Sequence, residues 1–173
     1  MKNLEWTTID KSGWADGEWK NEPDKVQFSD ETTGLPCLIV RGPSGALCGY
    51  VGVTQGHPFY ERDYDDCRHE CLKTDPDDSY GEWIDVHGGL TFANKCRPNE
   101  DESKGICHTV ESGEDDNVWW LGFDCAHADD YSPMHSGRKE ACFQRHSSEI
   151  YRTVSYVRGQ CEHLAKQLMA VAE

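Results

Sequence analysis

Short apolar stretches alternate with long polar ones along most of the chain. Residues 35–41 and 46–53 are rich in β-forming residues and flank the turn sequence Gly-Pro-Ser-Gly, which predicts a β-hairpin. Residues 118–125 show the strongest strand pattern. By alternation, one face of that strand holds Trp119, Leu121, Phe123 and Cys125, and the other holds Val118, Trp120, Gly122 and Asp124. We expect the first face to be buried in the core.

A further strand is predicted between two polar connections. Residues 83–87 alternate, a Gly-Gly pair at 88–89 allows a tight turn or bulge, and residues 90–93 continue the strand pattern. The connections on either side, 54–82 and 94–117, are long for plain loops, so they are expected to be functional or locally cross-linked.

The end of the chain carries one apolar stripe at helical spacing. Its members recur at steps of three and four residues: Ile150, Val154, Val157, Cys161, Leu164, Leu168 and Val171. Ser147 or Ser148 is expected to cap the start of the helix. The stripe fits either a helix that covers a sheet or a dimeric coiled-coil seam, which would make the protein an oligomer. A sheet that needs a cover favours the first.

These elements predict an α+β fold. We expect a mostly antiparallel sheet of about four to six strands, one long C-terminal helix packed on it, and long polar loops. The chain is expected to form a single domain over residues 1–173. Within it, 1–34 should be an irregular arm pinned by its aromatic side chains, 35–146 the sheet with two long polar insertions, and 147–173 the helix.

Charge narrows the choice of partners. The chain has 17 Lys and Arg against 32 Asp and Glu, and its net charge is −15. Nucleic-acid backbones and anionic membranes require a basic surface, so neither is expected as a partner. A small anion is still compatible, because a pocket sets its own local field. We find no apolar run near the ~20 residues of a membrane span and no signal-peptide pattern, which predicts a cytoplasmic protein.

The chain has nine cysteines, an odd number, and shows no secretory signal. Together these two features predict reduced thiols. Those in apolar runs, such as Cys37 and Cys48, are expected to be small buried residues. Four others lie in polar sequence and are candidate zinc ligands: Cys67, Cys71, Cys96 and Cys107. Their spacing is loose, so unpaired surface or half-buried thiols are the favoured interpretation.

Two segments that contain histidine are predicted to leave the sheet at strand ends. His87 precedes two glycines, whose backbone can approach a ligand closely. Asp124 lies at the end of the strand at 118–125 and His127 and Asp130 follow it, and we expect these residues to converge with His87. The complete candidate ligand-binding set is His57, His87, Gly88, Gly89, Trp120, Asp124, His127, Asp130, Arg41 and Tyr50. The alternative is that each side chain only satisfies a turn or strand end, which is favoured for His57.

Five segments carry a resemblance that covers nearly the whole chain: residues 22–27, 34–41, 48–53, 86–91 and 119–127. Together they resemble a family of small proteins encoded by bacteriophages and some bacteria. The resemblance implies a phage-like genome context, and therefore the host cell cytoplasm. It implies no activity, cofactor or catalytic residue. By analogy of origin, such proteins often act against host defences, including by capturing nucleotide signals.

Three functions follow from these observations. The first is a small-molecule binding protein that needs no cofactor and sequesters a nucleotide-like host defence signal. In that site Trp120 and Tyr50 stack on a ring, and the polar groups are bound by His87, His127, Asp124 and Arg41.

The alternatives use the same chain differently. One is a metal-dependent hydrolase in which Asp130 acts on bound water and a divalent metal such as zinc is held by His57, His87, Asp124 and His127. The other is an acidic interaction module that inhibits a host factor. H-E-x-x-H, Walker-type and G-x-S-x-G motifs are absent from the sequence, so whether the protein is an enzyme is left open.

Overall fold

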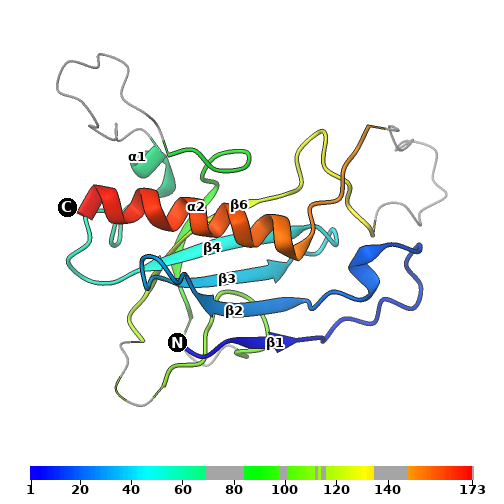
Figure 1. Ribbon diagram of the computed structural model, residues 1–173, viewed down its shortest axis with the longest axis horizontal. Coiled ribbons are helices and arrows are strands. Elements are labelled where there is room, and N and C mark those ends of the chain that lie inside the picture. The colour runs from blue at the N-terminus through cyan, green and yellow to red at the C-terminus, as the bar shows by residue number, and fades with distance from the viewer. Residues whose placement is uncertain (69–83, 98–100, 112, 114–115, 135–147, 173) are drawn as a thin grey trace.

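The computed structural model describes residues 1–68, 84–97, 101–111, 113, 116–134 and 148–172. Its six strands form one antiparallel sheet in the order β1-β2-β3-β4-β6-β5 (Figure 1). The strands are β1 (Leu4–Trp6), β2 (Lys25–Ser29), β3 (Pro36–Arg41), β4 (Leu47–Val53), β5 (Phe92–Lys95) and β6 (Trp119–Asp124). The helices are α1 (Tyr64–Arg68), α2 (Val154–Ala172) and the 3-10 turn η1 (Glu18–Lys20). The expected α+β class is confirmed. In the part of the chain that the structure describes, no helix combines the length and the apolar character needed to cross a membrane.

The predicted hairpin and the predicted central strand are both present. Strands β3 and β4 are antiparallel neighbours, with Arg41 opposite Leu47. Gly45 takes a φ of 85° in the turn between them, a conformation that glycine adopts without strain. Strand β6 then pairs with the other edge of β4, with Cys48 opposite Asp124. The end of β6 therefore lies beside the start of β4.

Two sequence expectations differ from the structure. Residues 1–34 contain β1 and β2, where we expected an irregular arm, and β2 is paired along its whole length with β3. Residues 84–87 form no strand, and residue 83 lies outside the described residues. The reason is that the backbone of this stretch bonds to side chains of α2. The Gln167 side chain bonds both the amide and the carbonyl of Asp85, and Gln160 accepts from the amide of His87.

Helix α2 lies across one face of the sheet, as the apolar stripe predicted (Figure 1). Its inner side chains are fully buried: Val157, Cys161, Leu164 and Leu168. They pack with Leu121 and Phe123 of β6. Gly49 of β4 makes this close packing possible, because a Cβ there would lie 2.3 Å from the Phe123 ring. The expected core face of β6 is confirmed.

The helix begins later than expected, at Val154. Ser148 precedes it by several residues and so does not provide the cap, and Ser147 lies outside the described residues. The free amide of Val154 donates to Glu22 Oε1 at 2.8 Å, and Thr153 Oγ1 accepts from a following amide at 3.2 Å. A glutamate from the N-terminal segment therefore performs the capping that we assigned to a serine.

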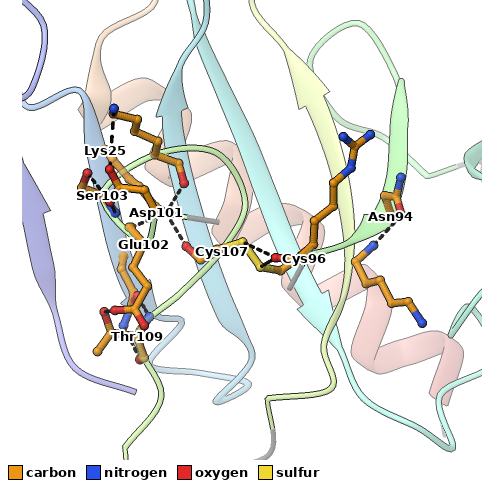
Figure 2. Close-up of a disulfide and its surroundings, with 12 residues drawn as sticks. Lys25, Asn94, Cys96, Asp101, Glu102, Ser103, Cys107 and Thr109 are labelled. Atoms are coloured by element: carbon orange, nitrogen blue, oxygen red, sulfur yellow. Dashed lines mark hydrogen bonds and ion pairs between the residues drawn. A yellow bond between two sulfur atoms is a disulfide. The ribbon is translucent and has the colours of Figure 1, made fainter. Parts of the chain in front are cut away.

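The opposite face of the sheet carries a smaller apolar cluster of Leu38, Val118 and Trp120. Ile106 packs against it from a loop closed by a disulfide between Cys96 and Cys107, which lies in front of the strands in Figure 2. The expectation of reduced thiols is therefore wrong for this pair. The buried cysteines Cys37, Cys125 and Cys161 are free thiols, as is the half-buried Cys48. Burial raises the pKa of Cys37 to about 12, so it stays protonated and inert.

Two buried polar residues of β2 hold this loop in place. The ammonium of Lys25 is almost completely buried and donates to the carbonyls of Glu102, Lys104 and Cys107 (Figure 2). The Gln27 amide exchanges two hydrogen bonds with the backbone of Thr109, at 2.8 and 3.0 Å. A buried ammonium has to be paired or fully hydrogen-bonded, so the loop carbonyls and the lysine require each other.

Truncation of the helix stripe should destabilise the fold. We expect Leu164→Ala to lower the free energy of unfolding by roughly 2–5 kcal/mol, because it leaves a cavity between α2 and the sheet. The exposed Lys166→Ala is the control on the same helix and should change stability little. Chemical denaturation measures both. A Leu164→Ala variant that changes only its oligomeric state would place the stripe at an interface instead.

Reduction of the disulfide should destabilise the loop that covers the second face. The cysteines are separated by 11 residues, and a loop of this length contributes roughly 2–3 kcal/mol by constraining the unfolded chain. We expect dithiothreitol to lower the denaturation midpoint of the wild type. The double variant Cys96→Ser/Cys107→Ser should start at the lower midpoint and not respond. An equal response of both proteins would contradict this assignment.

Candidate functional site

A cluster of two histidines and one aspartate lies where β6 leaves the sheet. Asp130 follows β6 and is held by a parallel bridge to Ile150, the residue that leads into α2. Its side chain is only 1% exposed. Asp130 Oδ2 lies 2.7 Å from His87 Nε2 and 3.5 Å from His127 Nδ1, and it accepts from the His127 amide at 3.1 Å. The expected convergence of His87, His127 and Asp130 is therefore present.

The start of α2 completes the cluster from the other side. The Tyr156 hydroxyl lies 2.9 Å from His87 Nδ1, and Gln160 Oε1 accepts from the His87 amide at 2.9 Å. Arg152 Nε donates to Asp130 Oδ1 at 2.8 Å, and its guanidinium carbon lies 4.9 Å from the centre of the Tyr156 ring. The sequence analysis missed these three residues. The spacing of four between Tyr156 and Gln160 is the signal that could have found those two, since it places them on one side of α2, whereas Arg152 precedes the helix.

The two glycines expected at this site have a steric role. Gly88 and Gly89 take φ values of 67° and 81° and turn the chain just after His87. A Cβ on Gly88 would lie 2.0 Å from the His127 ring. The two imidazole rings are consequently able to approach to 5.4 Å between centroids. Gly88 thus provides both the backbone conformation and the space for the histidine pair.

The electrostatics of the site favour a charged carboxylate. Burial by itself would raise the pKa of Asp130, but hydrogen bonds from Arg152 and His87 outweigh it, so the pKa lies below its usual value. The same bond to Asp130 raises the pKa of Arg152. One buried anion is thus surrounded by a guanidinium and two imidazoles. One ligand atom from each of His87, His127 and Asp130 lies within 4.8 Å of the others, so the three side chains form a candidate set of metal ligands.

Several expected members lie elsewhere. His57 Nε2 bonds the carbonyl of Leu168 at 2.8 Å, about 18 Å along α2 from Tyr156, and burial lowers the pKa of His57. Arg41 is buried in ion pairs with the N-terminal segment. Asp124 is at the end of β6, but its carboxylate accepts from the Thr91 hydroxyl and the amide of Ala126. None of the three is part of the His87 cluster.

The expected stacking platform is on the wrong side of the sheet. Trp120 is fully buried beneath the disulfide loop, with His108 edge-on at 5.3 Å. Tyr50 packs edge-on against Phe92 in the same cluster. His87 contacts α2, which covers the opposite face, so Trp120 and Tyr50 cannot stack on a ligand bound beside it.

The candidate cysteine site for zinc is not formed by its described members. Cys67 is buried in the main core, and Cys96 is bonded to Cys107. Cys71 lies outside the described residues. A sulfur in a disulfide offers no thiolate to a metal, so the histidine cluster is the candidate metal centre in the part of the chain that the structure describes.

Comparison with known proteins adds no assignment to this site. The chain matches no family model, no curated protein and no solved structure. The chemical arguments below therefore rest on the residues themselves.

The steric role of Gly88 can be tested against a matched glycine. Gly34 has a similar φ of 76°, but a Cβ there would meet no atom within 4 Å. Both Gly88→Ala and Gly34→Ala should lose about 1–2 kcal/mol of stability through backbone strain. Only Gly88→Ala should also move the His127 imidazole signals in a ¹⁵N NMR spectrum. Unchanged His127 signals in folded Gly88→Ala would contradict the proposed packing.

Proposed function

We propose that the protein binds a divalent transition-metal ion through His87, His127 and Asp130, and that a small polar molecule binds at this centre. The observation that carries the proposal is the shared carboxylate: Asp130 Oδ2 faces nitrogen atoms of both imidazoles, at 2.7 and 3.5 Å. Two histidines and one carboxylate are a ligand set used for zinc and for non-haem iron.

The hydrogen bonds around His87 suit this role. A histidine ligand usually bonds through its second ring nitrogen to a neighbour that orients the ring. Tyr156 supplies that neighbour at Nδ1. Its hydroxyl can donate to Nδ1 while Nε2 keeps a proton for Asp130, or accept from Nδ1 once Nε2 binds a metal. The protein can therefore hold His87 in place both with and without the ion.

The three proposed metal ligands differ in how far their side chains are exposed to solvent. Asp130 is 1% exposed, His87 13% and His127 39%. The carboxylate of Asp130 is thus buried, and the cluster is reached from solvent through the two histidines. Three protein ligands leave a coordination position for water or another small molecule, as in catalytic zinc sites.

Sequestration of a small ligand stays a proposal. The site proposed for it differs from the one that the sequence predicted. The metal centre replaces the aromatic platform of Trp120 and Tyr50, which lies on the opposite face of the sheet. A role against host defences, expected from the resemblance to phage proteins, also stays a prediction.

Hydrolysis is the second candidate, and the open side of the cluster favours it. Asp130 would be a ligand in this site, because its Oδ2 faces nitrogen atoms of both imidazoles. As a ligand it would not also be the base that we expected, and that role stays a prediction. Turnover of a chromogenic phosphodiester by zinc-loaded protein, lost after chelation and regained with zinc, would favour hydrolysis over simple binding.

Metal binding is tested by titration of the folded, oxidised protein with Zn²⁺, or with Co²⁺ as a coloured substitute. We expect one ion per chain at the cluster. His87→Ala, His127→Ala and Asp130→Asn should each lose this binding, and Tyr156→Phe should weaken it about tenfold through loss of the orienting bond. Thermal melts check that each variant is folded.

The control is His163→Ala, which removes an exposed histidine of α2 that pairs with the surface residue Asp85. It should bind metal like the wild type, and so exclude general attraction of cations to an acidic protein. Equal binding by the wild type and by folded His127→Ala would overturn the proposal.

A further inference from the structure

Arg152 has more hydrogen-bonding capacity than the fold uses. Its Nε donates to Asp130, and the guanidinium stacks on the Tyr156 ring. Among the residues that the structure describes, no other group bonds to its two terminal nitrogens. The side chain is 21% exposed. The guanidinium is therefore fixed in position at the cluster while its terminal N–H groups stay available.

Arg41 shows what a structural arginine looks like in this chain. Its side chain is 0% exposed and all three nitrogens are engaged. Nε donates to Asp24, Nη1 donates to Tyr151 and to the carbonyl of Gly45, and Nη2 donates to the carbonyl of Pro23. The difference between the two arginines points to a ligand role for Arg152.

We propose that Arg152 binds a phosphoryl group of the small molecule held at the metal centre. This inference rests on the proposed function. Arg152 and the imidazoles approach opposite oxygens of one carboxylate, Oδ1 and Oδ2 of Asp130. One small anion can therefore contact both the guanidinium and an ion bound beside the histidines. A guanidinium presents its N–H groups in a fork that matches the oxygens of phosphate.

The charge of the protein favours a phosphoryl group as the ligand over an anion with a single negative charge. The protein carries a net charge of −15, so an anion is repelled by the molecule as a whole. A site that overcomes this repulsion needs several local positive groups. A phosphate monoester carries up to two negative charges and three acceptor oxygens, and so it uses a metal ion and a guanidinium together. A monoanionic carboxylate gains less from the same pair.

The probe for this inference is inorganic phosphate, titrated into zinc-loaded protein by calorimetry, with acetate as the comparison anion. We expect phosphate to bind more tightly than acetate. Arg152→Lys keeps a positive charge beside Asp130, so it should still bind zinc, but it should bind phosphate about 10- to 100-fold more weakly through loss of the fork. Arg158→Lys is the matched control, because that arginine packs on the Phe28 ring away from the cluster, and it should behave like the wild type.

The outcomes separate the two proposals. Failure of the wild type to bind zinc would overturn the proposed function. Zinc binding with equal phosphate affinity in the wild type and Arg152→Lys, or with acetate bound as tightly as phosphate, would overturn only the inference about Arg152. A second measurement uses the wild type alone: the terminal N–H signals of Arg152 should shift in NMR spectra when phosphate is added. Unchanged signals at saturating phosphate would contradict the proposal even if Arg152→Lys lost its metal.

Discussion

The carboxylate of Glu22 fixes where the long helix starts, and the rest of the architecture depends on that position. One oxygen accepts from the Val154 amide at 2.8 Å, and the other accepts from the Tyr151 hydroxyl at 2.5 Å. Arg41 ties the same glutamate to the sheet. A glutamate at a helix N-terminus satisfies free amides and is stabilised by the helix dipole. The apolar stripe holds α2 against the sheet, and Glu22 sets the position of α2 along the helix axis.

The geometry of the histidine cluster depends on the position of α2. Arg152 and Tyr156 lie within a few residues of the capped helix start, so their positions relative to β6 follow from the cap. Asp130 is drawn to the same place by its bridge to Ile150. His87 lies far from these residues in sequence, and its amide donates to the side chain of Gln160. The cluster is thus assembled by contacts to α2 as much as by the end of the sheet.

Local periodicity explains which parts of this structure could be predicted from sequence. The hairpin, the buried face of β6 and the helix stripe each depend on neighbours within a few residues, and each was predicted correctly, except that Ile150, which we expected in the stripe, precedes α2 and is exposed. The meeting of His87 with Asp130 was also predicted, although His87 precedes a glycine turn and does not end a strand. The helix cap could not be predicted because Glu22 is remote from α2 in sequence. The burial of Trp120 was missed for the same reason, since it depends on the pairing of Cys96 with Cys107.

The two faces of the sheet handle buried charge differently, and this bears on which one can host chemistry. On the loop side, Lys25 is enclosed by backbone carbonyls and is almost completely buried, so its charge is fully committed to structure. On the helix side, Asp130 is just as buried, but its partners Arg152 and His127 reach the surface. A charge whose partners are exposed can exchange a proton or a neighbouring ion without unfolding the protein. The side of the molecule beside α2 is therefore where an acidic chain of this kind can support a binding centre.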